Sequence, residues 1–154
     1  MNLPQYNSIT ADFKEYEFFS IGPKGKIKKL VSFTKVRSDP VMYNLAFGDA
    51  DSETGLINDK ITTNNDDRDI VLATVANTIN SFCDHNGDHY IFAAGSSPAR
   101  TRLYQMGINR LLGEIRKNFD VYGLIDNKFE AFDPRHNYDA FLVKRKQKHI
   151  FDNQ

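Results

Sequence analysis

The sequence predicts an α+β fold with a single antiparallel or mixed sheet and two main helices packed on one of its faces. Three observations lead to this prediction. The first part of the chain is rich in short apolar and β-branched runs separated by turn residues. Two later segments repeat apolar residues at helical spacing, and each is followed by another short apolar run. No internal repeat and no long linker interrupts this order.

Length and composition agree with one self-sufficient domain. A chain of 154 residues buries about 70% of the surface that its unfolded form exposes, so no disulfide or metal is needed to hold it together. We therefore expect one domain over residues 1–154, with flexible ends at 1–12 and 147–154.

The cysteine count and the hydropathy pattern indicate a cytoplasmic protein. Cys83 is the single cysteine, so an internal disulfide is excluded. No apolar run approaches the roughly 18 residues of a membrane-spanning helix. The opening residues MNLPQYNSIT lack the charged and apolar segments of a secretion signal. No membrane partner is expected.

Two hairpins are expected at the start of the chain. Residues 16–21 and 26–36 are apolar runs joined by GPKG, which supplies turn geometry. Residues 41–47 and 56–63 form a second pair, connected by the Gly- and Asp-rich segment GDADSETG. Together they predict four antiparallel strands.

The first helix is expected to follow directly. Its apolar positions recur at helical spacing, at Val71, Leu72, Val75, Ile79 and Phe82. Asn65 or Asp66 is the expected N-cap, and Gly87 is the expected stop. The apolar run over 89–94 is too short for another helix and predicts a buried strand.

The second helix is expected to begin after the turn GSSP, with Ser97 as N-cap and Pro98 at the first helical position. Its predicted apolar stripe consists of Leu103, Gly107, Leu111 and Ile115, with Ile108, Leu112 and Phe119 beside it. Gly107 and Gly113 each cost about 1 kcal/mol relative to alanine, which predicts close packing at these positions.

The end of the chain is less clearly patterned. Residues 121–125 and 128–132 predict a last pair of strands. Residues 137–146 fit a short helix or an edge strand, and the pattern leaves both alternatives open.

The segment between Ile91 and Gln105 is the clearest functional feature. It combines a buried strand, a glycine turn and a helix start, where free N–H groups and the helix dipole favour an anion. Arginine side chains can grip phosphate or carboxylate with two hydrogen bonds. The candidate residues for anion or phosphate binding are Gly95, Ser96, Ser97, Arg100, Thr101, Arg102 and Tyr104.

Two explanations compete for these arginines. A cation in the first turn of a helix opposes the helix dipole, so Arg100 and Arg102 call for a compensating anion. That anion is either a ligand or a carboxylate from the acidic stretch over 49–69. The segment lacks the GK[ST] ending of a P-loop, and no base stands near the two serines to activate a nucleophile.

Other polar clusters predict no cofactor and no metal. The segment DADSETGLINDK departs from a calcium loop at Thr54 and Lys60, although its carboxylates Asp49, Asp51, Glu53 and Asp59 are of the type that holds Mg²⁺. The same residues are common in turns. Likewise, the segment DHNGDH with His85 and His89 reads as a polar loop, and Cys83 as a small core residue.

The first hairpin is basic. Residues 22–37 hold six basic and no acidic side chains. Lys24, Lys26 and Lys28 alternate along the strand and therefore share a face, with aromatic residues nearby. Such a face suits a nucleic-acid backbone, while solvated lysines that protect a sheet edge are the simpler explanation.

Four segments resemble a known family: YEFFSIGPKGKIKKLVSF, YNLAFGDAD, VLATVANTI and GSSPARTRLYQMGI. They resemble a short bacterial family known only as a domain of unknown function. The resemblance covers nearly the whole chain, through the signatures GPKG, YNLAFGD and GSxPARTRLYQM. It implies a bacterial protein of one domain and brings no activity, ligand or catalytic residue with it.

Three hypotheses for function follow from the sequence. The first is binding of nucleic acid or a nucleotide, in a toxin–antitoxin or defence locus, with Arg100, Arg102 and the basic hairpin contacting phosphates. The second is a protein-interaction module or homo-oligomer without catalysis. The third is an enzyme that acts on a phosphorylated small molecule, for which the sequence offers no paired acid and base.

Overall fold

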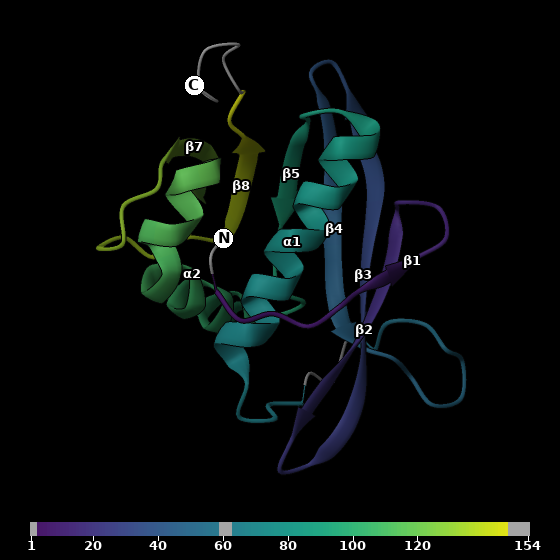
Figure 1. Ribbon diagram of the computed structural model, residues 1–154. Coiled ribbons are helices and arrows are strands. Elements are labelled where there is room, and N and C mark those ends of the chain that lie inside the picture. The colour runs from purple at the N-terminus through teal and green to yellow at the C-terminus, as the bar shows by residue number, and fades with distance from the viewer. Residues whose placement is uncertain (1–2, 59–62, 148–154) are drawn as a thin grey trace, which may run out of the picture.

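One mixed sheet and two helices make up the computed structural model, which describes residues 3–58 and 63–147. The elements follow in the order β1 (Ile9–Thr10), β2 (Glu15–Gly22), β3 (Gly25–Ser38), β4 (Val41–Asp49), α1 (Arg68–Asn86), β5 (Tyr90–Ala93), α2 (Pro98–Asn118), β6 (Phe119–Ile125), β7 (Lys128–Ala131) and β8 (Ala140–Arg145). The predicted α+β fold with a single sheet is confirmed (Figure 1).

The eight strands form one sheet in the order β1-β2-β3-β4-β5-β8-β6-β7. Neighbouring strands are antiparallel except β4 and β5, which are parallel and are connected through α1. The core lies between the sheet and the helices, where the fully buried ring of Phe82 from α1 stacks on Phe33 of β3 with ring centroids 4.4 Å apart. Both helices therefore contribute to one face of the sheet (Figure 1).

The opposite face of the sheet carries a second set of rings. Side chains alternate between the two faces of a strand, so Phe19 lies opposite the buried Phe18 and Phe92 lies opposite the buried Ile91. Neither described helix covers this face.

The first hairpin forms as predicted, and its turn depends on two special residues. Gly25 has φ +89°, which glycine adopts without strain. The Asn65 side chain accepts a hydrogen bond from the Lys24 N–H at 2.8 Å and donates one to the Gly25 carbonyl at 2.9 Å. Asn65 thus fastens the turn instead of capping a helix.

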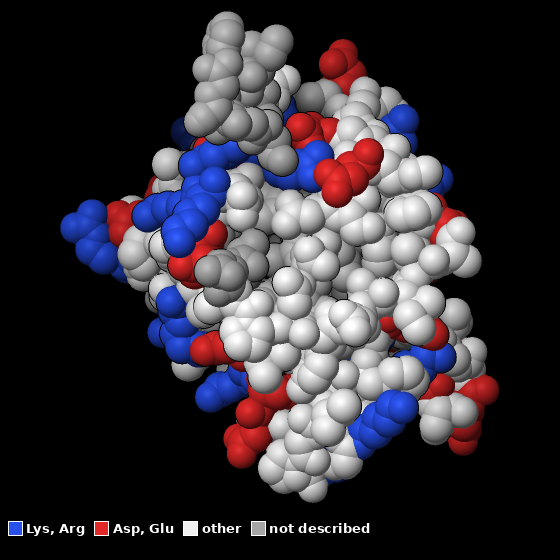
Figure 2. Space-filling model, viewed as in Figure 1, with Lys and Arg blue, Asp and Glu red and all other residues white. Residues whose placement is uncertain are grey.

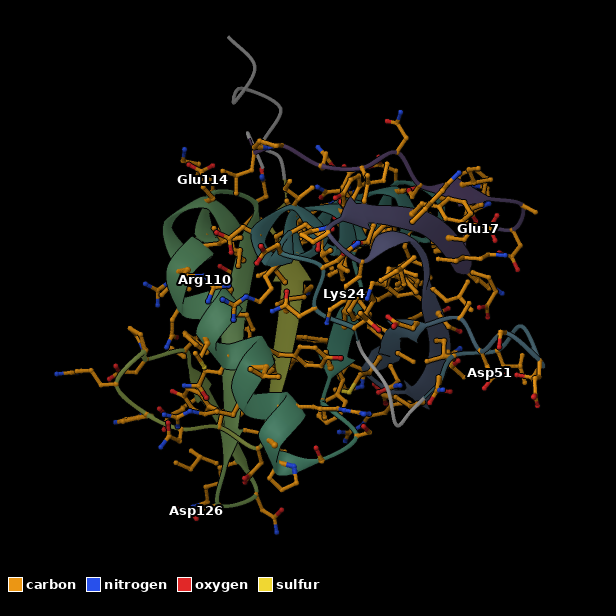
Figure 3. All side chains as sticks on the ribbon, turned by 90° about the horizontal axis from the view of Figure 1, so that it is seen from below. Glu17, Lys24, Asp51, Arg110, Glu114 and Asp126 are labelled. Atoms are coloured by element: carbon orange, nitrogen blue, oxygen red, sulfur yellow. The ribbon has the colours of Figure 1, made fainter. Side chains whose placement is uncertain are left out.

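The predicted strand over 56–63 is wrong for the described residues 56–58 and 63. After β4 the Asp51 side chain accepts hydrogen bonds from the backbone amides of Glu53 and Thr54, at 2.8 and 3.0 Å. The resulting loop projects from the molecule at Asp51 (Figure 3). Among the described residues 56–58 and 63, pairing with the preceding chain is limited to a bridge between Ile57 and Ala50. The fourth antiparallel strand is instead the short β1, which pairs with β2.

The first helix ends at Gly87 as predicted, but it begins later than expected. Its N-cap is Asp67, whose carboxylate makes no capping hydrogen bond. That carboxylate accepts hydrogen bonds from the hydroxyls of Ser20 (2.5 Å) and Tyr6 (2.7 Å) instead. The N-caps predicted at Asn65 and Asp66 are therefore wrong, because the chain before Asp67 is held against the first hairpin.

The second helix begins as predicted, with Ser97 accepting a hydrogen bond from the Arg100 N–H and with Pro98 at the first position. Its predicted stripe is wrong at Leu103, which is 56% exposed. The buried face passes through Gln105, whose side chain accepts a hydrogen bond from the Tyr138 N–H at 2.9 Å. At the start of the helix the buried side therefore includes Gln105 and not Leu103.

The last strands are placed differently from the prediction. The hairpin of β6 and β7 forms as expected. Residues 140–145, however, form β8, which lies between β5 and β6 in the interior of the sheet. Both alternatives for 137–146, a helix and an edge strand, are therefore wrong. No helix in the described part of the chain is long and apolar enough to cross a membrane.

Candidate functional site

The predicted turn from β5 into α2 closes on itself. The Gly95 N–H donates to the Thr101 hydroxyl at 3.0 Å, and this hydroxyl donates to the Ser97 carbonyl at 3.1 Å. A hollow of about 320 Å³ lies here, lined by Gly95, Ser96, Ser97, Pro98, Thr101, Tyr138 and Asp139. The structure thus brings four of the predicted site residues together, beside a carboxylate that disfavours an anion.

The two predicted arginines diverge. Arg100 donates to the Ser96 hydroxyl at 2.5 Å, whereas Arg102 donates to the side-chain oxygen of Asn137. Residues two positions apart on a helix do not face each other. The structure therefore does not bring both guanidinium groups to one anion.

The acidic stretch does not neutralise these arginines within the described residues. Asp49 pairs with Lys29, and Asp69 pairs with Arg110. Asp67 accepts from two hydroxyls, as described above. The predicted alternative of an ion pair between Arg100 or Arg102 and these three carboxylates is not formed.

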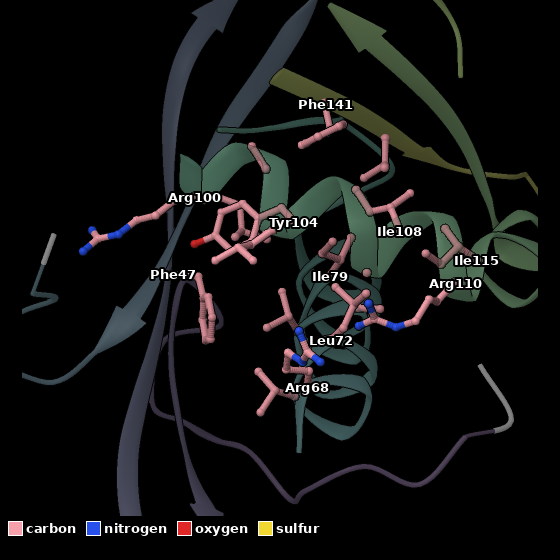
Figure 4. Close-up of a pocket in the computed structure, with 18 of the residues that line it drawn as sticks. Phe47, Arg68, Leu72, Ile79, Arg100, Tyr104, Ile108, Arg110, Ile115 and Phe141 are labelled. Carbon is pink, nitrogen blue, oxygen red and sulfur yellow. The ribbon is translucent and has the colours of Figure 1, made fainter. Parts of the chain in front are cut away.

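A cavity of about 500 Å³ lies between the helices and the sheet. We call it the interlayer cavity (Figure 4). Its walls are mainly apolar side chains from both layers, among them Leu45, Phe47, Val71, Leu72, Val75, Ile79, Ile91, Ala93, Ile108, Ile115, Val121, Phe141 and Val143. This volume falls in the range of small-molecule sites.

Three arginines also line the interlayer cavity: Arg68, Arg100 and Arg110. In Figure 4 the side chains of Arg68 and Arg110 extend toward one another beside Leu72, while Arg100 extends away on the side of Tyr104. Arg110 makes two hydrogen bonds to a single oxygen of Asp69, at 2.9 and 3.0 Å. Arg68 makes no ion pair with a described carboxylate. The cavity therefore combines an apolar wall with excess positive charge.

Tyr104 forms part of the wall next to Arg100. Its ring centroid lies 6.4 Å from that of Phe47. Burial raises the pKa of Tyr104 above its ordinary value, and the positive charge of Arg100 partly offsets this rise. The Tyr104 hydroxyl makes no hydrogen bond to a described residue, so it is a donor available to a ligand.

A buried ion pair lies at the edge of the interlayer cavity. Lys29 is 1% exposed, and its ammonium group pairs with Asp49 and donates to the Thr63 carbonyl at 2.8 Å. The second carboxylate oxygen of Asp49 accepts the Thr63 N–H at 2.9 Å. The pair therefore holds both backbone polar groups of Thr63 against β3 and β4.

The lysines of the basic hairpin have separate partners. Lys28 pairs with Glu17 at 2.9 Å, and the Lys26 ammonium lies 4.3 Å from the centre of the Phe19 ring. Lys24 binds Asn65 through its backbone. On the face that bears the helices, charged side chains of both signs gather around an uncharged centre (Figure 2).

The remaining polar candidates have structural partners. Arg145 donates to both Asp84 (2.5 Å) and Asp88 (2.7 Å) and so ties β8 to the end of α1. His89 contacts the Asn86 carbonyl at 2.9 Å.

No group of metal-ligating side chains of the kind that holds an ion occurs within the described residues, and the predicted candidate Asp59 lies outside them. His85 stacks on the Phe13 ring, with ring centroids 4.2 Å apart. Burial raises the pKa of the Cys83 thiol to about 11, as suits a residue of the core.

A second polar cluster was not anticipated from the sequence. The Glu130 carboxylate accepts hydrogen bonds from the Tyr138 hydroxyl (2.6 Å) and from the ring of His136 (2.7 Å), and both hold the pKa of Glu130 below its ordinary value. The Tyr138 hydroxyl also accepts the Asp133 N–H at 2.9 Å. These contacts close the loop between β7 and β8, and Glu130 and His136 lie outside the lining of both hollows.

Arg68 and Arg110 were also not singled out from the sequence. Arg68 carried the same signal as Arg100, because it is a cation in the first turn of a helix. Arg110 carried no signal, since the middle of an exposed helix face is an ordinary place for arginine.

Comparison with known proteins identifies one family. A family of unknown function (DUF6934) matches the chain over residues 2–146. No curated protein and no solved structure matches the chain. The match confirms the resemblance to a family of unknown function.

Proposed function

The chain belongs to this family of unknown function, and we propose that the protein binds a small organic anion in the interlayer cavity. The observation that carries the proposal is an apolar cavity of about 500 Å³ that Arg68, Arg100 and Arg110 also line. Ligand sites of this type have mainly apolar walls with a small number of polar groups that fix orientation.

Charge favours an anion over a neutral ligand. Of these three arginines, Arg110 forms an ion pair with the carboxylate of Asp69. Arg68 and Arg100 have no carboxylate partner among the described residues. An anion that enters the cavity meets guanidinium groups whose hydrogen bonds to it are charge-assisted.

Calorimetric unfolding with and without added compounds tests this proposal. At least one organic anion from a panel of AMP, decanoate and a naphthalene carboxylate is expected to raise Tm. At a concentration 100 times Kd, the stabilisation is about 2.7 kcal/mol. Neutral counterparts such as adenosine and decanol are expected to have a smaller effect.

Two matched variants control for binding elsewhere. Ala93 lines the interlayer cavity, so Ala93→Phe fills it and is expected to remove the ligand-induced rise in Tm. Ala131 is exposed on β7, and Ala131→Phe is expected to retain the rise. An equal rise in both variants would place the anion outside the cavity and contradict the proposal.

A second candidate function is binding of single-stranded nucleic acid on the uncovered face of the sheet. The specific observation is a pair of cations over rings: Lys26 lies 4.3 Å from the Phe19 centroid, and Lys144 lies 4.9 Å from the Tyr90 centroid. Phe92 is also on this face, 6.5 Å from the Phe129 ring. Aromatic side chains beside cations provide stacking platforms for bases and contacts for phosphates.

Fluorescence anisotropy with a labelled single-stranded RNA tests the second candidate. We expect affinity to fall as salt rises, and Tyr90→Ala to weaken binding about tenfold because one stacking contact is worth about 1–3 kcal/mol. Tyr104→Ala, on the helix side, is the control. Absence of RNA binding would contradict this candidate. A dimer that Tyr90→Ala dissociates in light scattering would assign the face to protein interaction instead.

A further inference from the structure

We infer that the ligand of the interlayer cavity is an amphipathic anion, with its charged head between Arg68 and Arg110 and an apolar chain extending between the layers. The inference rests on the proposed function and names the class of ligand. It follows from the position of the cations relative to the apolar wall.

The head position follows from the charges at one end of the interlayer cavity. Arg68 begins α1, and Arg110 comes from the middle of α2. Asp69 binds Arg110 through one oxygen, and the Asp67 carboxylate, which also lines the cavity, accepts hydrogen bonds from two hydroxyls. Arg68 is therefore left without a carboxylate partner among the described residues. The planar guanidinium fork binds a carboxylate or phosphate with two parallel hydrogen bonds.

The two guanidinium groups are also accessible. Arg68 is exposed, and the side chain of Arg110 is 39% exposed. A head group can therefore bind Arg68 and Arg110 while it remains partly in water, which avoids the large cost of burying a charge. The ligand head is thus expected at the surface, above the apolar wall.

The chain position follows from the residues beneath the head. Leu72 lies beside the two guanidinium groups, and its side chain approaches the backbone of Gly107 in the facing helix. Deeper in the cavity the wall consists of Val75, Ile79, Ile91, Val121, Phe141 and Val143. None of these side chains donates or accepts a hydrogen bond, so a sugar or a base would lose its hydrogen bonds with water without replacement. An alkyl chain makes no hydrogen bonds with water, so its transfer into this apolar space is favourable.

Arg100 has a different position. Its guanidinium group donates to Ser96, and its side chain extends away from the converging pair (Figure 4). The placement of the head at Arg68 and Arg110 is therefore distinguishable from placement at Arg100 by substitution of single arginines.

Isothermal titration calorimetry with octanoate, decanoate, decyl phosphate and AMP tests the inference. Each pair of added methylenes is expected to tighten binding by about 15-fold, at about 0.8 kcal/mol per buried CH₂. Arg68→Gln and Arg110→Gln are each expected to weaken decanoate binding by about tenfold or more, through loss of a charge-assisted hydrogen bond. Arg135→Gln, an exposed arginine paired with Asp133 in the last loop, is the matched control and is expected to bind as the unmodified protein does.

The outcomes separate the inference from the proposed function. Binding of AMP without binding of the alkyl anions would overturn the inference and leave the proposed function standing. Loss of binding in Arg100→Gln but not in Arg68→Gln or Arg110→Gln would overturn the placement of the head. Failure of all four probes to bind, with Ala93→Phe raising Tm in their absence, would identify the cavity as a packing defect and overturn both.

Discussion

Lys29→Met is expected to lower the free energy of unfolding by about 3–5 kcal/mol, which is the usual effect of removing one partner from a buried ion pair. The ammonium group of Lys29 is the counterion of the Asp49 carboxylate, and both side chains are at most 10% exposed. Without Lys29, a buried carboxylate and the Thr63 carbonyl both lose a donor. Urea unfolding followed by circular dichroism measures the change.

Two further variants show whether the effect comes from the unpaired charge. Lys28→Met removes the neighbouring lysine, whose pair with Glu17 is 44% and 36% exposed, and it is expected to change stability by less than about 1 kcal/mol. The double variant Lys29→Met with Asp49→Leu is expected to recover a large part of the loss, because no buried charge remains. A Lys29→Met protein as stable as Lys28→Met would contradict the structural role given to this pair.

Gly95→Ala is expected to lower the free energy of unfolding by about 3 kcal/mol, or roughly 6–12 °C in Tm for a chain of this length. An added Cβ would lie 2.7 Å from the carbonyl carbon of Arg100, and it would also collide with the backbone nitrogen of Thr101. Both atoms belong to the backbone of α2, so neither can rotate away. The end of β5 and the start of the helix would have to separate. Thermal unfolding measures the shift.

Gly113→Ala is the matched control, because it makes the same substitution on the same helix. Gly113 is exposed, and nothing lies within 4 Å of an added Cβ. This variant is expected to raise stability by about 1 kcal/mol through helix propensity. Equal effects of the two substitutions would show that the close approach at Gly95 has no energetic consequence.

The local features of the fold could be predicted because local residues determine them. Ser97 and Pro98 define the start of α2, and Gly87 ends α1, through contacts within one turn of the helix. The first hairpin follows in the same way from its turn. The start of α1 could not be predicted, because Asn65 and Asp67 are engaged by Lys24, Ser20 and Tyr6 from distant parts of the chain.

Strand order and the extent of the loop after β4 depend on similar long-range contacts. The apolar run of β8 predicts a buried segment equally well as a helix or a strand, and nothing within it indicates pairing with both β5 and β6. The run over 56–63 is apolar enough for a strand, yet within its described part Ile57 follows the turn at Asp51 and forms an isolated bridge.

The sequence directed attention to arginines at a helix start, but not to the interlayer cavity. The reasoning that a cation in the first turn of a helix calls for an anion applies to Arg68 as much as to Arg100. The interlayer cavity could not be predicted, because its wall consists of residues such as Val75, Ile91 and Phe141, which have the sequence pattern of an ordinary core. Only the packing of two helices on the sheet shows that these side chains leave space between them.

Because β8 lies in the interior of the sheet, the sheet cannot be completed until this strand has been synthesised. During synthesis β5 and β6 are made before residues 140–145, so until these residues are added the sheet lacks the strand that lies between its two halves. Each half then exposes an unpaired strand that is able to bind another nascent chain. The last strand joins the halves by pairing with both at once, and Arg145 fastens it to α1 through Asp84 and Asp88. Completion of the sheet therefore waits for a strand that is made after both of its neighbours.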